Sequence, residues 1–426
     1  MSTAGGDRPI RVLAVDHTAG VIPFRKKFDA LAAHPEVRLT VLAPERWIEN
    51  YRDIRAEAHE GPGYSFRVGR VGWPGYENRS FFRSGLGPAL RASCPDILHL
   101  WEEPFSAIAL QALLLARIRA PRAKALFFSS DNLSGDFHYS YRPSFAYSTV
   151  ERLAHRWCAM GTAVSEEVAG VLRRKGFAKP IAVIPNGIDP AAYGLGSGRA
   201  AGGAPRRADA AEVRERLGLE PPVVGFLGRL LHQKGIDLLL RAVGRLGEGN
   251  GARPLPSLAV IGTGPDEEPL RALVADLGLG DRVRFLPGVP HGEVPAVLAC
   301  LEILVLPSRG TPRWREQFGR VLVEGMAAGC CVVGTRSGGI PEVIADAGLV
   351  VPEEGVDELA TALRRLLEDG GLRATLRARG LERVRAQYTW EVIAERLVGI
   401  YRDLLGGDPA ADGTGSKLRL ASTRDA

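Results

Sequence analysis

Hydrophobic positions along the chain gather in short runs that alternate with longer stretches of helical spacing. Each run has the length of a buried strand and is followed by turn residues or by a helix-forming stretch. The runs of the first half are Ile10 to Val15, Val37 to Leu42, Ile97 to Leu100, Ala125 to Phe128, Gly161 to Val164 and Ile181 to Ile184. Those of the second half are Val223 to Leu227, Leu258 to Ile261, Val283 to Leu286, Leu301 to Leu306, Cys331 to Gly334 and Leu349 to Val351. Strands that alternate with helices form parallel sheets covered by helices, so the pattern predicts an α/β protein with two Rossmann-like domains.

The two sets of strands also divide the chain into domains. The turn-forming segment Pro185 to Asp189 follows the first set, and the Gly-, Ala- and Arg-rich stretch Gly194 to Ala208 is typical of a flexible insertion. A polar, Gly-bearing sequence closes the chain and predicts disorder there. We expect an N-terminal domain at 1–187, a linker and flexible insertion at 188–221, a C-terminal domain at 222–388, a further helix at 389–405 and a disordered tail at 406–426.

Composition narrows the class of protein. The 426 residues are 45% hydrophobic, which is enough to fill two ordinary cores. No stretch approaches the ~18 uninterrupted apolar residues of a membrane span, and the N-terminus lacks the apolar core of a signal peptide. The five cysteines form no Cys-x-x-Cys pair, which is typical of a reducing compartment. The net charge of +6 is mild and fits phosphorylated or acidic substrates, with no indication of nucleic acid. We expect a cytoplasmic protein, with a peripheral position on the inner leaflet as the alternative.

Two carboxylates stand eight positions apart across a junction between a loop and a helix. Glu316 lies on the loop, and Glu324 lies within the first turns of the helix that good helix formers predict from about Gly319 to Ala328. The backbone amides of Phe318, Gly319 and Arg320 stand at the start of that helix, where they have no partner within it and attract anions. Free amides with flanking carboxylates suit a ligand with phosphate at one end and vicinal hydroxyls at the other, such as a sugar nucleotide.

A second group of polar residues follows the run Val223 to Leu227. Gly228 and Arg229 begin a loop that reaches Lys234 before the next helical stretch. Departure of a nucleoside diphosphate builds negative charge on its phosphates, and fixed cations in a cleft with little water stabilise that charge. The alternative is that Arg229 and Lys234 are ordinary solvated loop cations.

The Glu-x7-Glu pair, together with this Gly-Arg…Lys-Gly element, resembles the signature of the retaining glycosyltransferases of family 4. The resemblance implies the GT-B fold, in which two parallel sheets face each other across a cleft and a C-terminal helix crosses back to the N-terminal domain. It implies catalytic roles for Arg229, Lys234 and Glu316, with the cations on the donor pyrophosphate and the carboxylate on the transferred sugar. Further donor-binding residues implied by the resemblance are Glu324 on the ribose, the helix-start residues Phe318, Gly319 and Arg320, and Gly228, Gly262, Val289 and Gly339 in the surrounding loops.

The N-terminal half matches the family mainly by architecture. The resemblance places six acceptor-side candidates after the first, third and fourth predicted strands: His17, Gly20, His99, Glu103, Ser129 and Asp131. His99 alternates within an apolar run, so a core histidine is the competing interpretation. Phe128 occupies the place where many relatives carry a histidine close to the reacting sugar. The segment Phe24 to Phe28 mixes cations with aromatic residues and suits either an anionic membrane surface or a helix start with two core phenylalanines.

We expect neither a metal nor another cofactor. The chain has no Asp-x-Asp and no His/Cys group with zinc spacing. Family resemblance implies same-face attack with retention, in which the leaving phosphate accepts the proton of the acceptor and the carboxylates orient hydroxyls. The predicted reaction transfers a hexose or N-acetylhexosamine from a UDP- or GDP-activated donor to a glycan, lipid-linked or small-molecule acceptor. The alternatives are a sugar-nucleotide epimerase of the GT-B fold and a non-catalytic partner subunit that binds nucleotide sugars.

Overall fold

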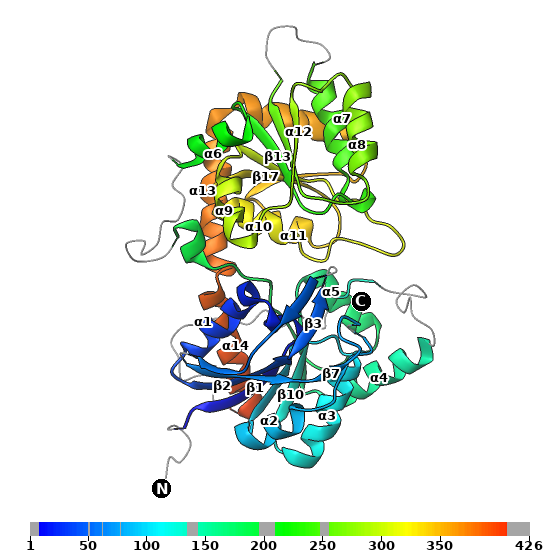
Figure 1. The fold of residues 1–426 in the computed structure, drawn as a ribbon, viewed down its shortest axis with the longest axis vertical. Coiled ribbons are helices and arrows are strands. Elements are labelled where there is room, and N and C mark those ends of the chain that lie inside the picture. The colour runs from blue at the N-terminus through cyan, green and yellow to red at the C-terminus, as the bar shows by residue number, and fades with distance from the viewer. Residues whose placement is uncertain are drawn as a thin grey trace. The chain divides into compact units, whose positions relative to one another are not determined.

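The computed structural model describes residues 8–49, 52–61, 63–76, 78–133, 144–195, 209–247 and 255–406. The chain forms two compact units, each built of a sheet and its helices (Figure 1). Unit 1 comprises residues 1–187 and 390–426, and unit 2 comprises residues 188–389. The chain therefore leaves unit 1 after Gly187 and returns to it at Trp390. Residues 407–426 of the expected tail and 196–208 of the expected insertion lie outside the described residues.

Unit 1 is built on an 8-stranded sheet with the strand order β12-β11-β10-β9-β1-β2-β6-β5. All neighbours are parallel except β5, which runs antiparallel to β6. In the central register Val12 of β1 stands opposite Leu39 of β2 and Ile97 of β9. The strands are β1 Ile10–Val15, β2 Val37–Pro44, β5 His59–Gly61, β6 Tyr64–Gly69, β9 Ile97–Leu100, β10 Lys124–Ser129, β11 Met160–Ala163 and β12 Ile181–Val183. Every run predicted in the first half is confirmed as a strand.

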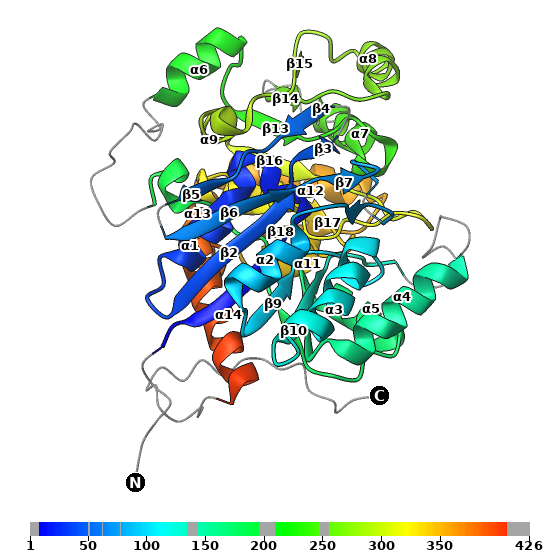
Figure 2. The same cartoon turned by 60° about the horizontal axis from the view of Figure 1, so that its bottom comes forward.

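Helices cover both faces of this sheet. Helices α2 to α5 lie on one face and α1 and α14 on the other (Figure 2). Ser106 and Ser165 cap α3 and α5 by accepting hydrogen bonds from backbone amides of the first turn. Their bounds are η1 His17–Gly20, η2 Ile22–Arg25, α1 Lys26–Ala32, α2 Leu86–Ser93, α3 Ala107–Arg119, α4 Ser144–Trp157, α5 Glu166–Arg174 and α14 Trp390–Leu405. Because α14 packs against α1 and buries Leu397 and Tyr401 in the core of unit 1, the prediction of a C-terminal helix that crosses back is confirmed.

Residues 45–82 hold short strands that the hydrophobic pattern did not reveal. β3 Arg46–Glu49 pairs antiparallel with β4 Arg52–Arg55, and β7 Val71–Gly72 pairs with β8 Phe81–Phe82. Each of these four strands has only two to four residues, so no continuous apolar run marks it. Period-two patterns this short carry little signal.

Unit 2 is built on a 6-stranded parallel sheet with the order β15-β14-β13-β16-β17-β18. Its strands are β13 Val223–Leu227, β14 Ser257–Ile261, β15 Val283–Leu286, β16 Ile303–Leu306, β17 Cys331–Thr335 and β18 Gly348–Val351. Most of their side chains are buried, as in a sheet covered on both faces. The runs predicted in the second half are confirmed, and the two-sheet α/β architecture with them.

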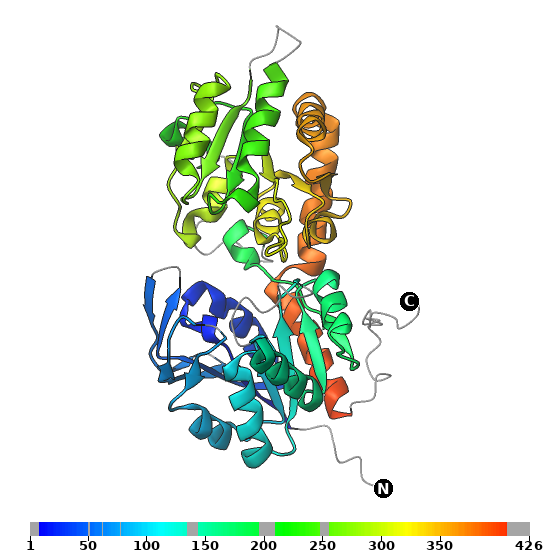
Figure 3. The same cartoon turned by 90° about the vertical axis from the view of Figure 1, so that its right-hand side faces the viewer.

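Helices flank this sheet on both sides (Figure 3). α12 packs on α7, and α13 packs on α10. Their bounds are η3 Pro190–Tyr193, α6 Asp209–Leu217, η4 His232–Lys234, α7 Ile236–Gly247, α8 Glu267–Asp276, η5 His291–Glu293, α9 Val294–Ala299, α10 Arg320–Ala327, α11 Ile340–Ile344, α12 Val356–Glu368 and α13 Gly370–Gln387. The helix α6 lies within the stretch 188–221 that the sequence predicted as linker and insertion, so that prediction was wrong for residues 209–217.

Candidate functional site

The predicted donor residues stand on loops at one edge of the sheet of unit 2. These loops follow β13, β14, β15, β16 and β17, and all of these strands are parallel, so their carboxyl ends meet at the same edge. Two of the loops touch through their backbones, because the Arg309 amide donates to the Gln233 carbonyl at 2.9 Å. The edge therefore brings together residues that the sequence separates by about a hundred positions.

Lys234 and Glu316 meet in an ion pair between two of these loops. Lys234 Nζ lies 2.7 Å from Glu316 Oε2, and Ser308 Oγ donates to the same oxygen at 2.9 Å. The Lys234 ammonium also lies 4.9 Å from the centre of the Trp314 ring, a cation–π arrangement. Glu316 is only 9% exposed. The carboxylate is thus held by Lys234 and Ser308 at the position where the sequence predicts a contact to the transferred sugar.

The start of α10 has the geometry that the sequence predicts for anion binding. Gly319 forms its N-cap with a φ of 85°, a left-handed conformation that favours glycine. Among the described residues, the backbone amides of Phe318 and Gly319 donate no hydrogen bond. The Phe318 side chain is buried and fixes this turn. The helix start therefore offers amide donors beside the Lys234–Glu316 pair.

Glu324 lies one turn into α10 and is 7% exposed. Arg320 Nε donates to Glu324 Oε1 at 3.0 Å, and Arg320 Nη2 lies 3.3 Å from His291 Nε2. Burial raises the pKa of Glu324, while Arg320 lowers it in part. Burial and, next, the charge of Glu324 raise the pKa of Tyr193 of η3, so Tyr193 lies within electrostatic range of this carboxylate. The sequence analysis did not single out Tyr193, because a single tyrosine after a turn carries no pattern.

The glycines of the donor loops let the loops approach one another. The Gly228 amide donates to the Ile261 carbonyl at 3.0 Å, and a side chain at Gly262, whose φ is 142°, would collide with the Gly228 carbonyl. The Gly339 amide donates to the Glu316 carbonyl at 2.9 Å. Arg229 next to Gly228 is exposed, and Val289 lies partly exposed in the loop after β15. We expected the glycine segment at 337–339 to pass close to the donor, and in the structure it packs against the loop that carries Glu316.

In unit 1, the loop after β1 carries two buried ion pairs. His17 Nδ1 lies 3.0 Å from Glu102 Oε2, and the His17 amide donates to Glu102 Oε1 at 2.8 Å. Asp16 pairs with Lys27 Nζ at 2.5 Å. Burial alone would raise the pKa of Asp16, but the charges of Lys27 and His17 lower it. Gly20 ends the same turn and packs near Ile54 and Ala56 of the β3–β4 hairpin.

His99 belongs to the core of unit 1. It is fully buried, stacks on Trp101, and its Nδ1 lies 2.8 Å from the Tyr401 hydroxyl. Burial lowers the pKa of His99 to about 3, so the ring is neutral. With no exposed surface it cannot contact an acceptor in this conformation. The structure thus corrects its placement among the acceptor-side candidates in favour of the core interpretation.

Glu103, Ser129 and Asp131 come together at the carboxyl ends of β9 and β10. Glu103 Oε2 accepts from Ser129 Oγ at 2.7 Å, and Glu103 Oε1 accepts from the Ser130 amide at 2.7 Å. Burial and the charge of Asp131 raise the pKa of Glu103 to about 7. Asp131 in turn pairs with Lys175 Nζ at 3.1 Å. Ser129 is buried, whereas Glu103 and Asp131 are partly exposed. Of these three residues, only Glu103 and Asp131 therefore have surface that an acceptor can contact.

The segment Phe24 to Phe28 does not form an exposed basic and aromatic face. Phe28 is fully buried, and the Lys27 ammonium is paired with Asp16 and lies 4.2 Å from the Trp101 ring centre. Only Lys26 of the two lysines is exposed. The structure therefore supports the interpretation of a helix start with a core phenylalanine over the alternative of a membrane-facing surface for this segment.

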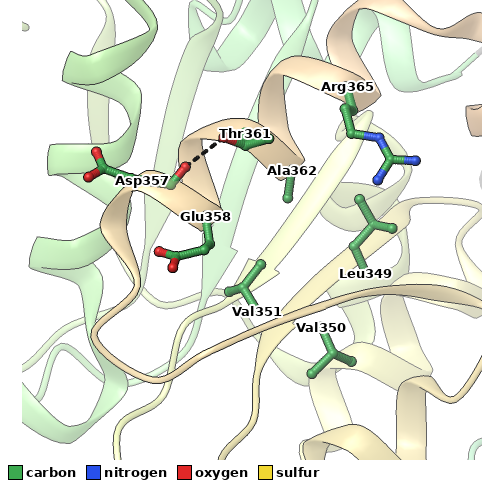
Figure 4. A pocket seen from close by; sticks show the side chains of 8 residues that line it. All are labelled: Leu349, Val350, Val351, Asp357, Glu358, Thr361, Ala362 and Arg365. Carbon is green, nitrogen blue, oxygen red and sulfur yellow. Dashed lines mark hydrogen bonds between the residues drawn. The ribbon is translucent and has the colours of Figure 1, made fainter.

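A groove of about 440 Å³ lies between β18 and α12, away from the predicted residues (Figure 4). Its walls are Leu349, Val350 and Val351 of β18 and residues of α12 from Asp357 to Arg365, where the Thr361 hydroxyl donates to the Asp357 carbonyl. None of the predicted donor residues lines it. Within the described ranges, no group of His, Cys, Asp and Glu side chains could hold a metal ion, and no helix there is long and apolar enough to cross a membrane.

Comparisons with known proteins agree with this geometry. Two family descriptions match the chain: "Glycosyl transferases group 1" over residues 209–383 and "Glycosyltransferase Family 4" over residues 29–192. A GDP-mannose-dependent alpha-(1-6)-phosphatidylinositol monomannoside mannosyltransferase of Mycobacterium tuberculosis is 33% identical over 327 residues, covering 74% of this chain and 77% of the relative. The chain belongs to glycosyltransferase family 4.

Another relative and a solved structure agree with this result. A 2-deoxystreptamine glucosyltransferase of Streptomyces kanamyceticus is 31% identical, covering 71% of this chain and 79% of the relative. The structure of sucrose-phosphate synthase from Thermosynechococcus elongatus superposes with a TM-score of 0.66 at 22% identity, covering 93% of this chain and 99% of the other. This family 4 protein is therefore a retaining, sugar-nucleotide-dependent hexosyltransferase with the GT-B fold, as the two carboxylates and the Gly-Arg…Lys-Gly element predicted.

Proposed function

We propose that the loops of unit 2 bind a UDP- or GDP-activated hexose or N-acetylhexosamine with a fixed division of labour. Glu324 accepts hydrogen bonds from the ribose diol, Arg229 and Lys234 bind the pyrophosphate, and Glu316 binds hydroxyls of the transferred sugar. The observation that carries the proposal is the Lys234–Glu316 ion pair of 2.7 Å. This pair lies next to the amides of Phe318 and Gly319 at the start of α10, and Glu324 lies one turn into the same helix. Charge-assisted hydrogen bonds of this kind are the strong ones.

In the reaction, the bond between the anomeric carbon and the diphosphate breaks, and the diphosphate leaves with the bonding electrons. Lys234, Arg229 and the amides at the start of α10 stabilise the charge that grows on it, because they are already oriented before the reaction. The acceptor hydroxyl attacks from the face that the leaving group vacates, which retains the anomeric configuration. Its proton goes to a phosphate oxygen of the leaving group, so Glu316 and Glu324 need not act as bases.

The relatives point to candidate donors and acceptors. The mycobacterial relative is GDP-mannose-dependent, and its name gives a phosphatidylinositol monomannoside as acceptor. The Streptomyces relative is named for a small-molecule acceptor, 2-deoxystreptamine. We therefore propose a GDP- or UDP-hexose as donor and a hydroxyl of a lipid-linked, glycan or small-molecule acceptor. The protein is proposed to act in the cytoplasm, which fits the free thiols of all five cysteines, four of which are buried.

A panel of nucleotide sugars tests the proposal through thermal stability. A donor that binds the folded protein raises the melting temperature by mass action. We expect one GDP- or UDP-hexose to raise it by several degrees at millimolar concentration, and the free diphosphate of the same base to do so as well. No rise with any GDP or UDP compound would contradict the proposal. Conversion of the donor to an epimer or to free sugar at full rate without acceptor would favour the epimerase alternative.

A contact with an anionic membrane surface is part of the proposal, carried by the outer face of α3. Leu114 is 45% and Ile118 is 76% exposed on this helix. Arg117 and Arg119 are exposed cations of the same helix, Arg122 and Lys124 are exposed cations just after it, and no acidic residue occurs from 104 to 130. Exposed apolar side chains next to cations suit binding to an anionic leaflet, because each basic residue near the surface adds ~1 kcal/mol to the binding free energy.

Sedimentation with vesicles of anionic phospholipid tests this contact. We expect binding at low salt, release at high salt, and loss of binding when Arg117 and Arg122 are both changed to Glu. Lys26→Glu is the matched control, because Lys26 is an exposed cation of unit 1 outside this face. Protein that stays in the supernatant at low salt, or equal loss of binding in the control, would rule the contact out.

A further inference from the structure

Arg309 is a buried arginine at the carboxyl end of the sheet of unit 2, just after β16. It is 6% exposed. Its Nη2 donates to both carboxylate oxygens of Asp237, at 2.9 and 2.8 Å, and its Nη1 lies 3.2 Å from the ring nitrogens of His232. Its Nε lies 2.8 Å from Glu354 Oε1, in an ion pair whose angle falls short of a hydrogen bond. The guanidinium is therefore surrounded by polar partners on all of its edges.

These partners belong to three separate loops. His232 and Asp237 flank the turn after β13, Arg309 itself lies in the loop after β16, and Glu354 lies in the loop after β18. Backbone contacts reinforce the junction, since the Arg309 amide donates to the Gln233 carbonyl and the Gly310 amide donates to Glu353 Oε2 at 2.9 Å. Arg309 is thus the point at which the loops of β13, β16 and β18 are joined.

The turn that Arg309 contacts, through His232 and Asp237, is the turn that carries Lys234. His232 lies two positions before Lys234 and Asp237 three positions after it, so Arg309 holds the turn on both sides. Lys234 itself contacts Glu316 and Trp314 rather than Arg309. Arg309 can therefore act on the donor phosphates only through the placement of Lys234.

Burial explains why this junction is stiff. A charged guanidinium removed from water is costly unless it is paired and hydrogen-bonded. Its planar fork fixes the directions of its donors, which an ammonium group does not. Any shift of the turn against the loop of β16 would leave the Arg309 guanidinium as an unpaired buried charge, since the Asp237 carboxylate is itself partly exposed. A single arrangement of the loops is thus favoured.

We propose that Arg309 is a positioning residue for catalysis, which sets the distance between the phosphate-binding Lys234 and the sugar-binding Glu316. The proposal rests on the proposed roles of Lys234 and Glu316. Displacement of a charged group by about 1 Å in an active site lowers turnover by ~100-fold. Lysine at position 309 keeps the charge but cannot hold His232, Asp237 and Glu354 at once.

The test compares Arg309→Lys and Arg309→Met with Arg214→Met. Arg214 is a partly buried arginine that joins the opposite ends of the same two strands, since it lies 3.2 Å from Glu302 Oε1 and Glu302 Oε2 accepts from the Val223 amide. We expect Arg309→Lys to keep the melting temperature close to wild type, to lower kcat by ~10- to 100-fold, and to leave KM for the acceptor unchanged. Arg214→Met should lose stability and keep its kcat.

Four outcomes decide the matter. A kcat of Arg309→Lys within twofold of wild type would overturn the proposal, as would a loss of kcat in Arg214→Met equal to that in Arg309→Lys. If Arg309→Met does not fold, Arg309→Lys still decides, together with Asp237→Asn, which loosens the same turn and should show the same fall in kcat. Failure of the wild-type protein to bind any nucleoside diphosphate would overturn the proposed function itself. If the wild type is active and Arg309→Lys is equally active, only the positioning role of Arg309 is overturned.

Discussion

Lys234 Nζ and Glu316 Oε2 lie 2.7 Å apart although their residues are 82 positions apart in the sequence. The ammonium is assigned to the donor pyrophosphate and the carboxylate to the transferred sugar. Each charge therefore balances the other before the donor arrives, and both must exchange partners when it binds. The two residues form one functional unit, and we expect mutations of them not to act independently.

A double-mutant cycle measures this coupling. We expect Lys234→Ala and Glu316→Gln each to lower kcat, and the double variant to be little worse than the more damaged single variant. Contacting residues show interaction energies of about 0.5–3 kcal/mol, whereas distant pairs add. The measurement is kcat at saturating donor for the four proteins. Additive losses would show that the pair of 2.7 Å has no role in turnover.

Lys234 should act chiefly on the transition state. Lys234→Ala removes a preorganised charge where the leaving diphosphate develops its own, so we expect kcat to fall by ~100-fold or more. Arg241→Ala is the matched control, because Arg241 is an exposed cation on α7, the helix that follows the same loop. Steady-state kinetics with both variants decide. Near-normal kcat with only a raised KM would mean that Lys234 binds donor and transition state alike.

Arg320 should keep Glu324 ionised. Burial raises the pKa of Glu324 and Arg320 lowers it in part, so Arg320→Ala should raise that pKa further. A protonated carboxyl accepts fewer hydrogen bonds from the ribose diol. We therefore expect the affinity of Arg320→Ala for the nucleoside diphosphate to fall more steeply than that of wild type as the pH is lowered. Titrations at three pH values test this, and parallel curves for the two proteins would refute it.

Glu103 makes the stability of unit 1 depend on pH. Burial, with the charge of Asp131, raises the pKa of Glu103 from 4.5 to about 7, so the folded protein retains a proton that the unfolded chain releases between these values. Its stabilising contribution is present below pH 4.5 and is lost as the pH rises through 7. Glu103→Gln imitates the protonated group at every pH. From pH 5 to pH 8 the melting temperature of wild type should fall by a few degrees relative to the variant. A constant difference would refute the assignment.

Much of the fold could be predicted from the sequence, because parallel strands covered by helices on both faces consist of continuous apolar runs. Ile10–Val15 and Val223–Leu227 are examples, and they are the strands β1 and β13 as predicted. The strands β3, β4, β7 and β8 were missed because they are short, and β6 was missed because the polar residues Ser65 and Arg67 interrupt its apolar ones. Helix α6 was missed because it follows a Gly- and Arg-rich stretch, whose composition is typical of a linker.

The part of the site that depends on spacing within one segment of the chain could also be predicted from the sequence. Glu316, Gly319 and Glu324 lie on one loop and one helix, so their separation in sequence determines which of them stand at the helix start. The Lys234–Glu316 contact, the junction at Arg309 and the position of Tyr193 depend on loops from different strands. Tertiary packing determines such contacts, and no pattern within one segment records them. His99 shows the reverse case, since its alternation within an apolar run correctly indicated a core residue.

Calorimetric titration of the free nucleoside diphosphate into wild type, Glu324→Ala and Glu316→Gln tests the division of labour at this site most directly. The free diphosphate carries the ribose and the phosphates but not the sugar. We expect Glu324→Ala to lose most of the affinity and Glu316→Gln to keep it within a few-fold, although Glu316→Gln should lose turnover with the complete donor. Equal loss of affinity in both variants, or unchanged affinity in Glu324→Ala, would contradict the account.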